Sequence, residues 1–140
     1  MLFGYNSDEG TLFFPDDEQP TIWIPDLAPG SKKELSTKLK EFFPANHKKL
    51  IDLYNLDEDF ILGGTQWMGD EIFGVNIRYV TRQNETHGGE SYLYHFSRVP
   101  PSNKQTIGAL HAAEIPFIFG SYDKTIGYSK EDIKLAELMQ

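Results

Sequence analysis

The sequence predicts an α/β fold with two parallel strands and several helices. Two short runs, residues 1–5 and 91–96, are apolar or aromatic and are bounded by turn-forming residues, which indicates strands. The long stretch between them has apolar residues at helical spacing. A strand–helix–strand order favours a parallel sheet, which needs further strands beside it and cover on both faces. Because two strands are too few, we expect residues 1–140 to be one fragment, incomplete as a stand-alone domain.

Helix-start and helix-stop residues place the first elements. Residues 14–30 contain four prolines and are predicted to be a loop. A helix is predicted from Ser31, with Glu34 completing a capping box, to Pro44. A second, shorter helix is predicted over about residues 46–55.

The longest helix is predicted over about residues 57–85. Its predicted apolar face consists of residues at helical spacing: Phe60, Gly64, Trp67, Glu71 or Ile72, Val75 and Tyr79. The sequence His87-Gly88-Gly89 is expected to end it, because glycine favours the left-handed conformation that follows a helix.

Beyond the second strand the prolines and caps again define the elements. Residues 100–108 contain Pro-Pro and are predicted to be a loop. In residues 111–119, Pro116 is expected to prevent a long helix. Ser129, with Asp132 three residues later, is predicted to cap a last helix that runs to Gln140.

Composition excludes several classes of function. The net charge is −8 and the basic residues are scattered, so we expect no nucleic-acid partner. The densest basic group is interpreted as a solvated helix face: Lys32, Lys33, Lys38 and Lys40. The chain has no cysteine, and its histidines at 47, 87 and 95 lack metal-ligand spacing with carboxylates, so we expect no metal and no other cofactor.

Membrane and export signals are also missing from the sequence. No apolar run approaches the roughly 20 residues that cross a bilayer, so we expect no membrane partner. Neither a basic segment nor a long apolar one follows Met1, as a signal peptide would require. The sequence does not specify a compartment, although the absence of both cysteine and a signal favours the cytoplasm.

Three motifs, in order along the chain, resemble the type-B carboxylesterase and cholinesterase family of α/β-hydrolases. Residues 3–14, FGYNSDEGTLFF, resemble the family's G-x-N-x-D-E-G-x-x-F segment. Residues 92–96, YLYHF, resemble its Y-x-Y-x-F strand. Residues 108–120, GALHAAEIPFIFG, resemble its G-A-x-H-x-x-E-[IL]-P-F-x-F-G motif. The resemblance implies the C-terminal part of an α/β-hydrolase sheet.

The resemblance makes Glu9 the acid and His111 the general base of a serine-esterase triad. A serine hydroxyl attacks effectively once an imidazole accepts its proton, and a carboxylate orients that imidazole. Both residues follow predicted parallel strands, whose carboxyl ends share one edge of the sheet. By spacing alone Asp8 is as good an acid as Glu9, and only the resemblance favours Glu9.

Further site residues are implied by the same motifs. Leu12 and Phe13 match positions that line the substrate pocket, and Glu114 matches a supporting glutamate that we expect to form a hydrogen bond in its own turn. Leu12 and Ala113 stand where cholinesterases have aromatic rings. Because choline recognition needs a ring face, a general apolar pocket for a small carboxylic ester is favoured.

The nucleophile of the triad is missing from the sequence. A nucleophile elbow reads G-x-S-x-G, and the lookalike Gly89-Glu90-Ser91-Tyr92-Leu93 lacks the second glycine and falls at the start of its strand rather than at the carboxyl end. The resemblance therefore implies the C-terminal portion of a serine ester hydrolase. We expect this portion to be inactive alone and to need an N-terminal part that carries the serine, as would follow from a truncated or split gene.

Two alternatives stay open. One is a non-catalytic esterase-like interaction module, although such a module has no need of both Glu9 and His111. The other is a self-associating subunit, because the strands would lack the neighbours that a complete sheet provides. Self-association is also compatible with the esterase interpretation, and we expect an oligomer.

Overall fold

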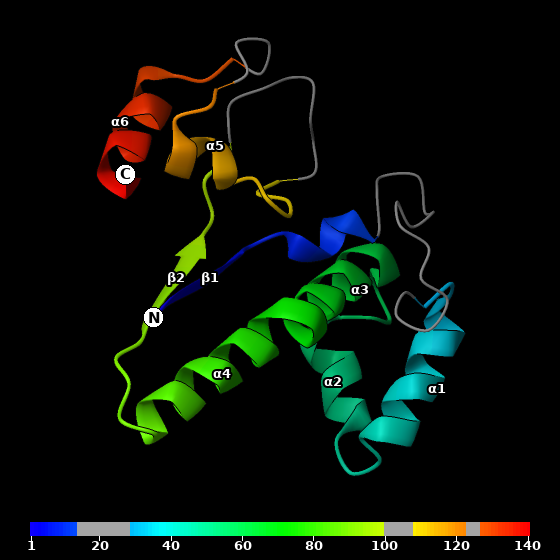
Figure 1. Cartoon of the computed structure of the whole chain (residues 1–140). Helices are drawn as coiled ribbons and strands as arrows, with labels where there is room; N and C mark the ends of the chain where they lie inside the picture. Colours follow the sequence, from blue (N-terminus) through cyan, green and yellow to red (C-terminus); the bar gives the residue numbers. More distant parts are fainter. Residues whose placement is uncertain (14–28, 100–107, 123–126) are drawn as a thin grey trace. The chain divides into compact units, whose positions relative to one another are not determined.

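The fold is described by a computed structural model in which residues 1–13, 29–99, 108–122 and 127–140 are placed (Figure 1). These residues cluster into two compact units. The sheet unit comprises residues 1–8 and 77–140, and the helical unit comprises residues 9–76. Most of the predicted loops, residues 14–28 and 100–107, lie outside the described residues.

The sheet unit is built on two parallel strands, as predicted. Strand β1 is Leu2–Asn6 and strand β2 is Tyr92–Phe96, with Leu2 opposite Tyr92 and Asn6 opposite Phe96. Because the strands are parallel, Asn6 and Phe96 lie at the same edge of the sheet. The α/β fold class is therefore confirmed.

The two short helices of the sheet unit pack together beyond β2 (Figure 1). Helix α5 is Ile115–Phe119, only five residues long, with Pro116 in its first turn, where the missing N–H costs nothing. Helix α6 is Lys130–Met139, and its N-terminus has the predicted reciprocal capping box. A small core joins these helices to β2 and consists of Phe96, Ala109, Phe117 and Ala136.

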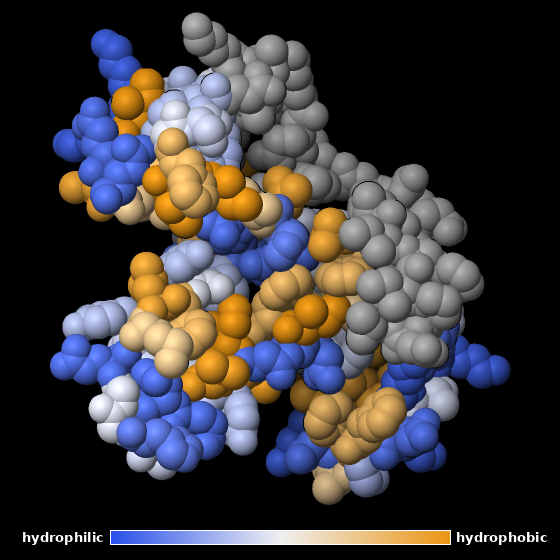
Figure 2. All heavy atoms as spheres, in the orientation of Figure 1, coloured by the Kyte–Doolittle hydropathy of each residue, from blue (hydrophilic) through white to orange (hydrophobic). Residues whose placement is uncertain are grey.

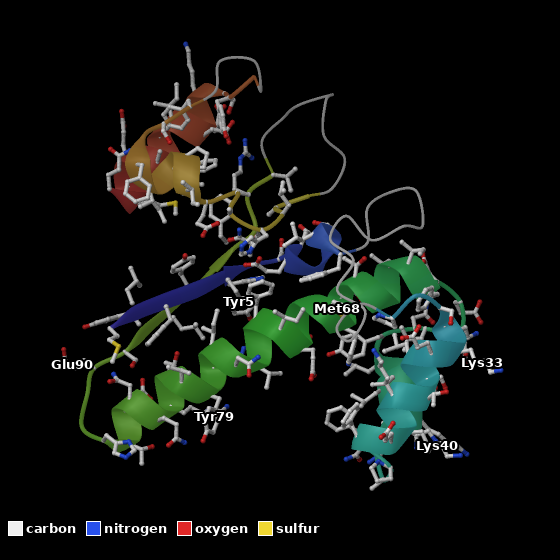
Figure 3. All side chains as sticks on the ribbon, turned by 45° about the vertical axis from the view of Figure 1, so that its right-hand side comes forward. Tyr5, Lys33, Lys40, Met68, Tyr79 and Glu90 are labelled. Carbon is white, nitrogen blue, oxygen red and sulfur yellow. The ribbon has the colours of Figure 1, made fainter. Side chains whose placement is uncertain are left out.

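The helical unit has a larger core. It begins with the 3-10 helix η1, Glu9–Leu12, and continues with α1 (Lys32–Phe42), α2 (His47–Leu53) and α3 (Phe60–Gly69). Its buried apolar side chains are Phe13, Leu35, Leu39, Leu56, Trp67 and Met68. Lys33 and Lys40 point outward from α1 in Figure 3, on the solvated face that the sequence predicted.

The N-terminus of α1 differs from the prediction. The Ser31 hydroxyl accepts a hydrogen bond from the Glu34 N–H at 3.2 Å, but the Glu34 carboxylate accepts from the Gly30 N–H at 2.9 Å. The predicted reciprocal capping box is therefore wrong, because Glu34 reaches one residue beyond the cap. The helix ends at Phe42, just before the predicted stop at Pro44, because the residue before a proline disfavours helical geometry.

The predicted helix over residues 57–85 contains a π turn. Helix α3 is followed by the π segment η2, Asp70–Gly74, and then by α4, Val75–Thr86. The Val75 N–H donates to the Asp70 carbonyl, and the Asn76 amide donates to the carbonyls of Glu71 and Ile72 at 2.8 and 2.9 Å. A side chain that binds these carbonyls favours the departure from α geometry.

The buried side of the helix changes beyond the π turn. Val75 and Tyr79, placed on the apolar face by a uniform helical period, are 60% and 62% exposed. The less exposed positions of α4 are instead Ile77, Thr81 and Asn84. The predicted face is therefore wrong beyond Ile72: from residue 77 the helix belongs to the sheet unit, so the neighbours that bury it change there.

The predicted helix end is confirmed. Gly88 has a φ of +80°, its N–H donates to the Glu85 carbonyl, and the N–H of Gly89 donates to the Asn84 carbonyl, both at 2.9 Å. This pair of hydrogen bonds is the Schellman arrangement, in which glycine provides the left-handed residue.

Candidate functional site

Hydrogen bonds join the turn that carries His111 to the carboxyl end of β1. Residues 8 and 110 form a parallel bridge, and the Asp8 N–H donates to the Ala109 carbonyl at 3.2 Å. The Asp8 carboxylate accepts from the Ala109 N–H at 2.8 Å, and the Asn6 amide donates to the Leu110 carbonyl at 2.8 Å. Three hydrogen bonds therefore join the end of the first strand to the two residues before His111.

His111 begins the turn that leads into α5. Its side chain is exposed, and the turn is closed by hydrogen bonds from Ala113 N–H to the Leu110 carbonyl and from Ile115 N–H to the Ala112 carbonyl, at 3.0 and 3.2 Å. Ala112 has a φ of +68°, a conformation that costs an L-residue about 1 kcal/mol. The backbone after His111 is thus held in a strained conformation by its surroundings.

Glu114 supports this turn from the far end. Its carboxylate accepts a hydrogen bond from the Asn6 amide at 2.6 Å. This partner lies at the end of β1, whereas the sequence predicts one within the turn itself. Asn6 is 2% exposed, and it binds Leu110 and Glu114 with the same amide nitrogen, which ties both sides of the His111 turn to one residue.

Glu9 lies in the helical unit as the first residue of η1. It is 5% exposed, which is unusual for a carboxylate. The next residue, Gly10, allows η1 to contact the backbone of α3: a Cβ on Gly10 would lie 1.8 Å from the Thr65 carbonyl oxygen. Gly69, on the same helix, is also in contact, because a Cβ there would lie 3.7 Å from the Glu9 Cβ.

Leu12 and Phe13, the proposed pocket residues, are packed in the helical unit. Phe13 is 4% exposed and belongs to the core that also contains Leu35 and Trp67. Leu12 is half-buried against the same core. The packing of both side chains fixes the chain directly after Glu9.

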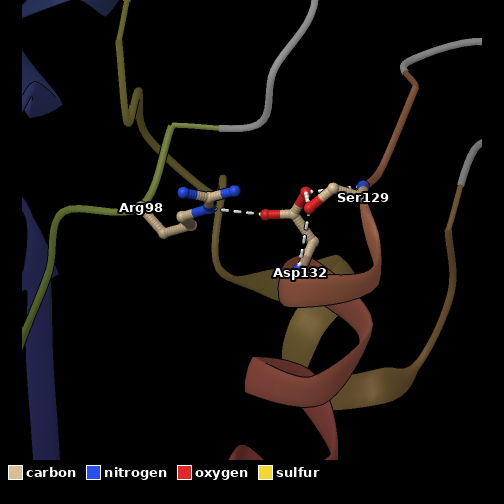
Figure 4. A network of polar contacts seen from close by, with 3 residues as sticks. All are labelled: Arg98, Ser129 and Asp132. Atoms are coloured by element: carbon tan, nitrogen blue, oxygen red, sulfur yellow. Dashed lines mark hydrogen bonds and ion pairs between the residues drawn. The ribbon is translucent and has the colours of Figure 1, made fainter.

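A second polar network lies beside α6. Figure 4 shows Arg98 Nε donating to Asp132 Oδ1 at 2.6 Å, while the Ser129 N–H and hydroxyl donate to Asp132 Oδ2 at 2.7 and 2.8 Å. Burial raises the pKa of the Asp132 carboxyl, but the hydrogen bonds from Arg98 and Ser129 outweigh it, so the pKa lies below its usual value. The same contact raises the pKa of Arg98.

Described residues of the helical unit line a cavity of about 400 Å³ and another of about 230 Å³. Both are lined by Phe43, Trp67 and Glu71, and neither is lined by Glu9, Leu12 or Phe13. Tyr54, at the larger one, donates a hydrogen bond to the Asp70 carboxylate at 3.0 Å. Burial and the neighbouring carboxylates raise the pKa of Tyr54, so its hydroxyl stays protonated. Apolar side chains also reach the surface (Figure 2), among them Phe42 and Leu53 at 69% and 71% exposed.

Within the described residues, no group of three or more histidine, aspartate or glutamate side chains is arranged to hold a metal ion. No described helix is both long enough and apolar enough to cross a bilayer.

Asn6 is the residue that sequence reasoning missed. It lies inside the first motif, but nothing in its spacing indicates that its amide binds a turn more than 100 residues later. Asp8 was considered as an acid, whereas its carboxylate binds the Ala109 N–H. The signal that could have revealed both is the position of polar residues at the carboxyl end of a buried strand, where site residues gather.

The model of the carboxylesterase family matches residues 1–140. Acetylcholinesterase 1 of Caenorhabditis elegans is 31% identical over 91 residues, which cover 61% of this chain and 14% of that protein. Carboxylesterase 1E of Rattus norvegicus is 34% identical over 76 residues, which cover 51% of this chain and 14% of that protein. In these matches the chain spans about one seventh of the length of its relatives.

Proposed function

Because this chain belongs to the carboxylesterase family, we propose that it supplies the acid and the base of a serine-esterase triad, Glu9 and His111. In α/β-hydrolases the triad follows the order serine, acid, histidine, and Glu9 and His111 stand in the last two places of that order. The serine would come from an N-terminal part carrying a G-x-S-x-G elbow, a motif that residues 1–140 do not contain.

One observation carries this proposal: the bridge between residues 8 and 110 pairs the residues that immediately precede Glu9 and His111 in the sequence. The Asp8 carboxylate is occupied in that connection, since it accepts hydrogen bonds from the Ala109 N–H and the Ser7 hydroxyl, both at 2.8 Å. Asp8 therefore has a structural role, which favours Glu9 as the acid. The low exposure of Glu9 also suits a group that orients an imidazole.

The proposed chemistry is acyl transfer. His111 takes the proton from the serine hydroxyl as it attacks the ester carbonyl, and then returns it to the leaving alcohol. Glu9 holds the imidazole in the correct tautomer and stabilises its charged form. Water then hydrolyses the acyl-serine by the same path in reverse. The mechanism requires neither a metal nor an organic cofactor.

The proposed substrate is a small carboxylic ester with apolar groups. Leu12 and Ala113 replace the aromatic rings that cation recognition requires, so selectivity for choline esters is not expected.

We propose that the chain alone is inactive. Without the serine no acyl-enzyme can form, and two members of a triad do not replace the third. A fluorophosphonate probe should therefore leave the purified chain unlabelled while it labels an intact serine esterase in the same reaction. Covalent labelling of any serine in the chain would refute this part of the proposal.

The triad roles are tested in a longer polypeptide, in which this chain is joined to upstream sequence of its gene that carries a G-x-S-x-G. Hydrolysis of p-nitrophenyl butyrate is measured. Glu9→Gln and His111→Gln should each lower kcat at least about a thousandfold. His87→Gln, an exposed histidine at the end of α4, is the matched control and should leave kcat unchanged. Full activity in His111→Gln would overturn the proposal.

Self-association is proposed as a second property of the chain. Within the described residues each strand pairs with one neighbour, and Leu2 and Tyr92 are 72% and 65% exposed. Strand edges of this kind pair readily with another chain. Light scattering should therefore show an oligomer that dissociates once the N-terminal part is supplied, and a monomer at high concentration would contradict the idea.

A further inference from the structure

The Arg98–Asp132 ion pair connects strand β2 to helix α6. Arg98 follows the end of β2 by two residues, and Asp132 occupies the first turn of α6. The Asp132 side chain is fully buried, whereas 38% of the Arg98 side chain is exposed. A buried carboxylate needs charged or N–H donors, and the contact at 2.6 Å is a charge-assisted hydrogen bond of the strong kind.

Helix α6 in turn holds α5. Ala136 of α6 is fully buried with Phe117 of α5, and the Gln140 amide donates to the Phe117 carbonyl at 3.2 Å. The Phe117 ring also meets the ring of Phe96, at the end of β2, with 5.0 Å between centroids. Helix α5 is therefore packed between the end of β2 and α6.

Helix α5 is the continuation of the His111 turn. It begins at Ile115, directly after Glu114, and its first N–H groups donate to carbonyls of that turn. The other end of the turn is bound to β1 through Asp8 and Asn6. With only five residues, α5 cannot hold its position by its own hydrogen bonds, so its placement depends on packing.

We propose that Arg98 and Asp132 are positioning residues for His111, which act by holding α6, and through it α5, in place. The inference rests on the proposed role of His111 as general base. A base must be held within about 0.5 Å of its productive geometry, and a residue on a turn reaches that precision only when the supporting elements are fixed. Neither side chain needs to touch the substrate.

Amide hydrogen exchange of the 140-residue chain, measured by NMR, tests the proposal. In Arg98→Gln, exchange at Ala113 and Ile115 should be at least about tenfold faster, the scale set by losing a hydrogen bond to a buried charge. The His111 ring signal should shift or broaden in the same variant, and Arg98→Lys should restore part of the protection. Glu137→Gln, which removes an exposed carboxylate from the same helix, should change exchange less than twofold.

The helical unit serves as the internal reference. Exchange at Leu35 and Leu39 should be the same in all variants, because the ion pair lies in the other unit. If α6 amides exchange faster in Arg98→Gln while Ala113, Ile115 and the His111 signal stay as in the unmodified chain, the proposal is wrong.

If Arg98→Gln unfolds entirely, the exchange rates of Arg98→Lys are the test. Equally faster amide exchange in both units of that variant would also overturn the proposal. Failure of the esterase proposal itself appears in kcat of His111→Gln and leaves these exchange rates untouched. In the longer active polypeptide, Arg98→Lys should lower kcat with little change in KM.

Discussion

Replacing Gly10 by alanine tests how closely η1 must approach α3. Gly10 does not have a positive φ, so alanine is conformationally allowed and the effect is purely steric. The new Cβ would lie 1.8 Å from the Thr65 carbonyl oxygen, 2.7 Å from the Thr65 carbonyl carbon and 3.0 Å from the Gly69 nitrogen. Contacts below 3.0 Å essentially never occur, so the two backbones must separate by about 1.2 Å, the difference between 3.0 and 1.8 Å.

The loss in the free energy of unfolding depends on which atoms the new Cβ displaces. Overpacking usually costs about 1–3 kcal/mol, and rigid backbone on both sides places Gly10→Ala near the upper end. For a unit of this size the urea slope is about 1–1.5 kcal/mol/M, so a loss of about 3 kcal/mol lowers the midpoint by about 2 M or more. If the helical unit is less stable than that, Gly10→Ala will be unfolded without urea.

Urea unfolding is followed by the fluorescence of Trp67, which lies in the core of the helical unit, in a Trp23→Phe background. Gly30→Ala is the matched control, because the Cβ there has only the Glu34 carboxylate in range, at 3.5 Å, and φ is not positive. We expect the control to stay within about 0.5 kcal/mol of the parent or to be slightly more stable. Equal midpoints for Gly10→Ala and Gly30→Ala would refute the close-packing argument.

Two further predictions concern the sheet unit. The folded-state pKa of Asp132 lies below the unfolded value of about 3.9, so its stabilising contribution is complete above about pH 4 and is lost as the pH falls through the folded pKa. Near-UV circular dichroism of the tyrosines around Phe117 should show this acid transition, and Asp132→Asn should flatten it; an identical transition in that variant would contradict the assignment. Ala112→Gly should stabilise the His111 turn by about 1 kcal/mol, because glycine relieves the strain of a φ of +68°. Ala113, the next residue, does not have a positive φ, so Ala113→Gly should instead speed amide exchange in the turn. If both variants speed exchange, or both slow it, the role of strain is refuted.

The sequence alone determined the local elements and indicated the family. Caps and breakers are local, so the start of α6 at Ser129 and the end of α4 at Gly88 could be predicted from the residues themselves. The parallel pairing of β1 and β2 followed from the intervening helices, because a short turn cannot join parallel strands. The motifs from which Glu9 and His111 are proposed as acid and base resemble those of the carboxylesterase family, whose model matches the whole chain.

The tertiary structure decided which side chains support the candidate site. Asn6 binds Leu110 and Glu114, and Arg98 binds Asp132, across sequence separations that no local period encodes. The π turn at residues 70–74 likewise depends on a side-chain amide competing for backbone carbonyls, a choice that the apolar pattern does not record. The folded geometry selects the hydrogen-bond partners, because a buried polar group must bind whichever donor or acceptor lies next to it. The spacing of residues along the chain specifies only which polar groups are available.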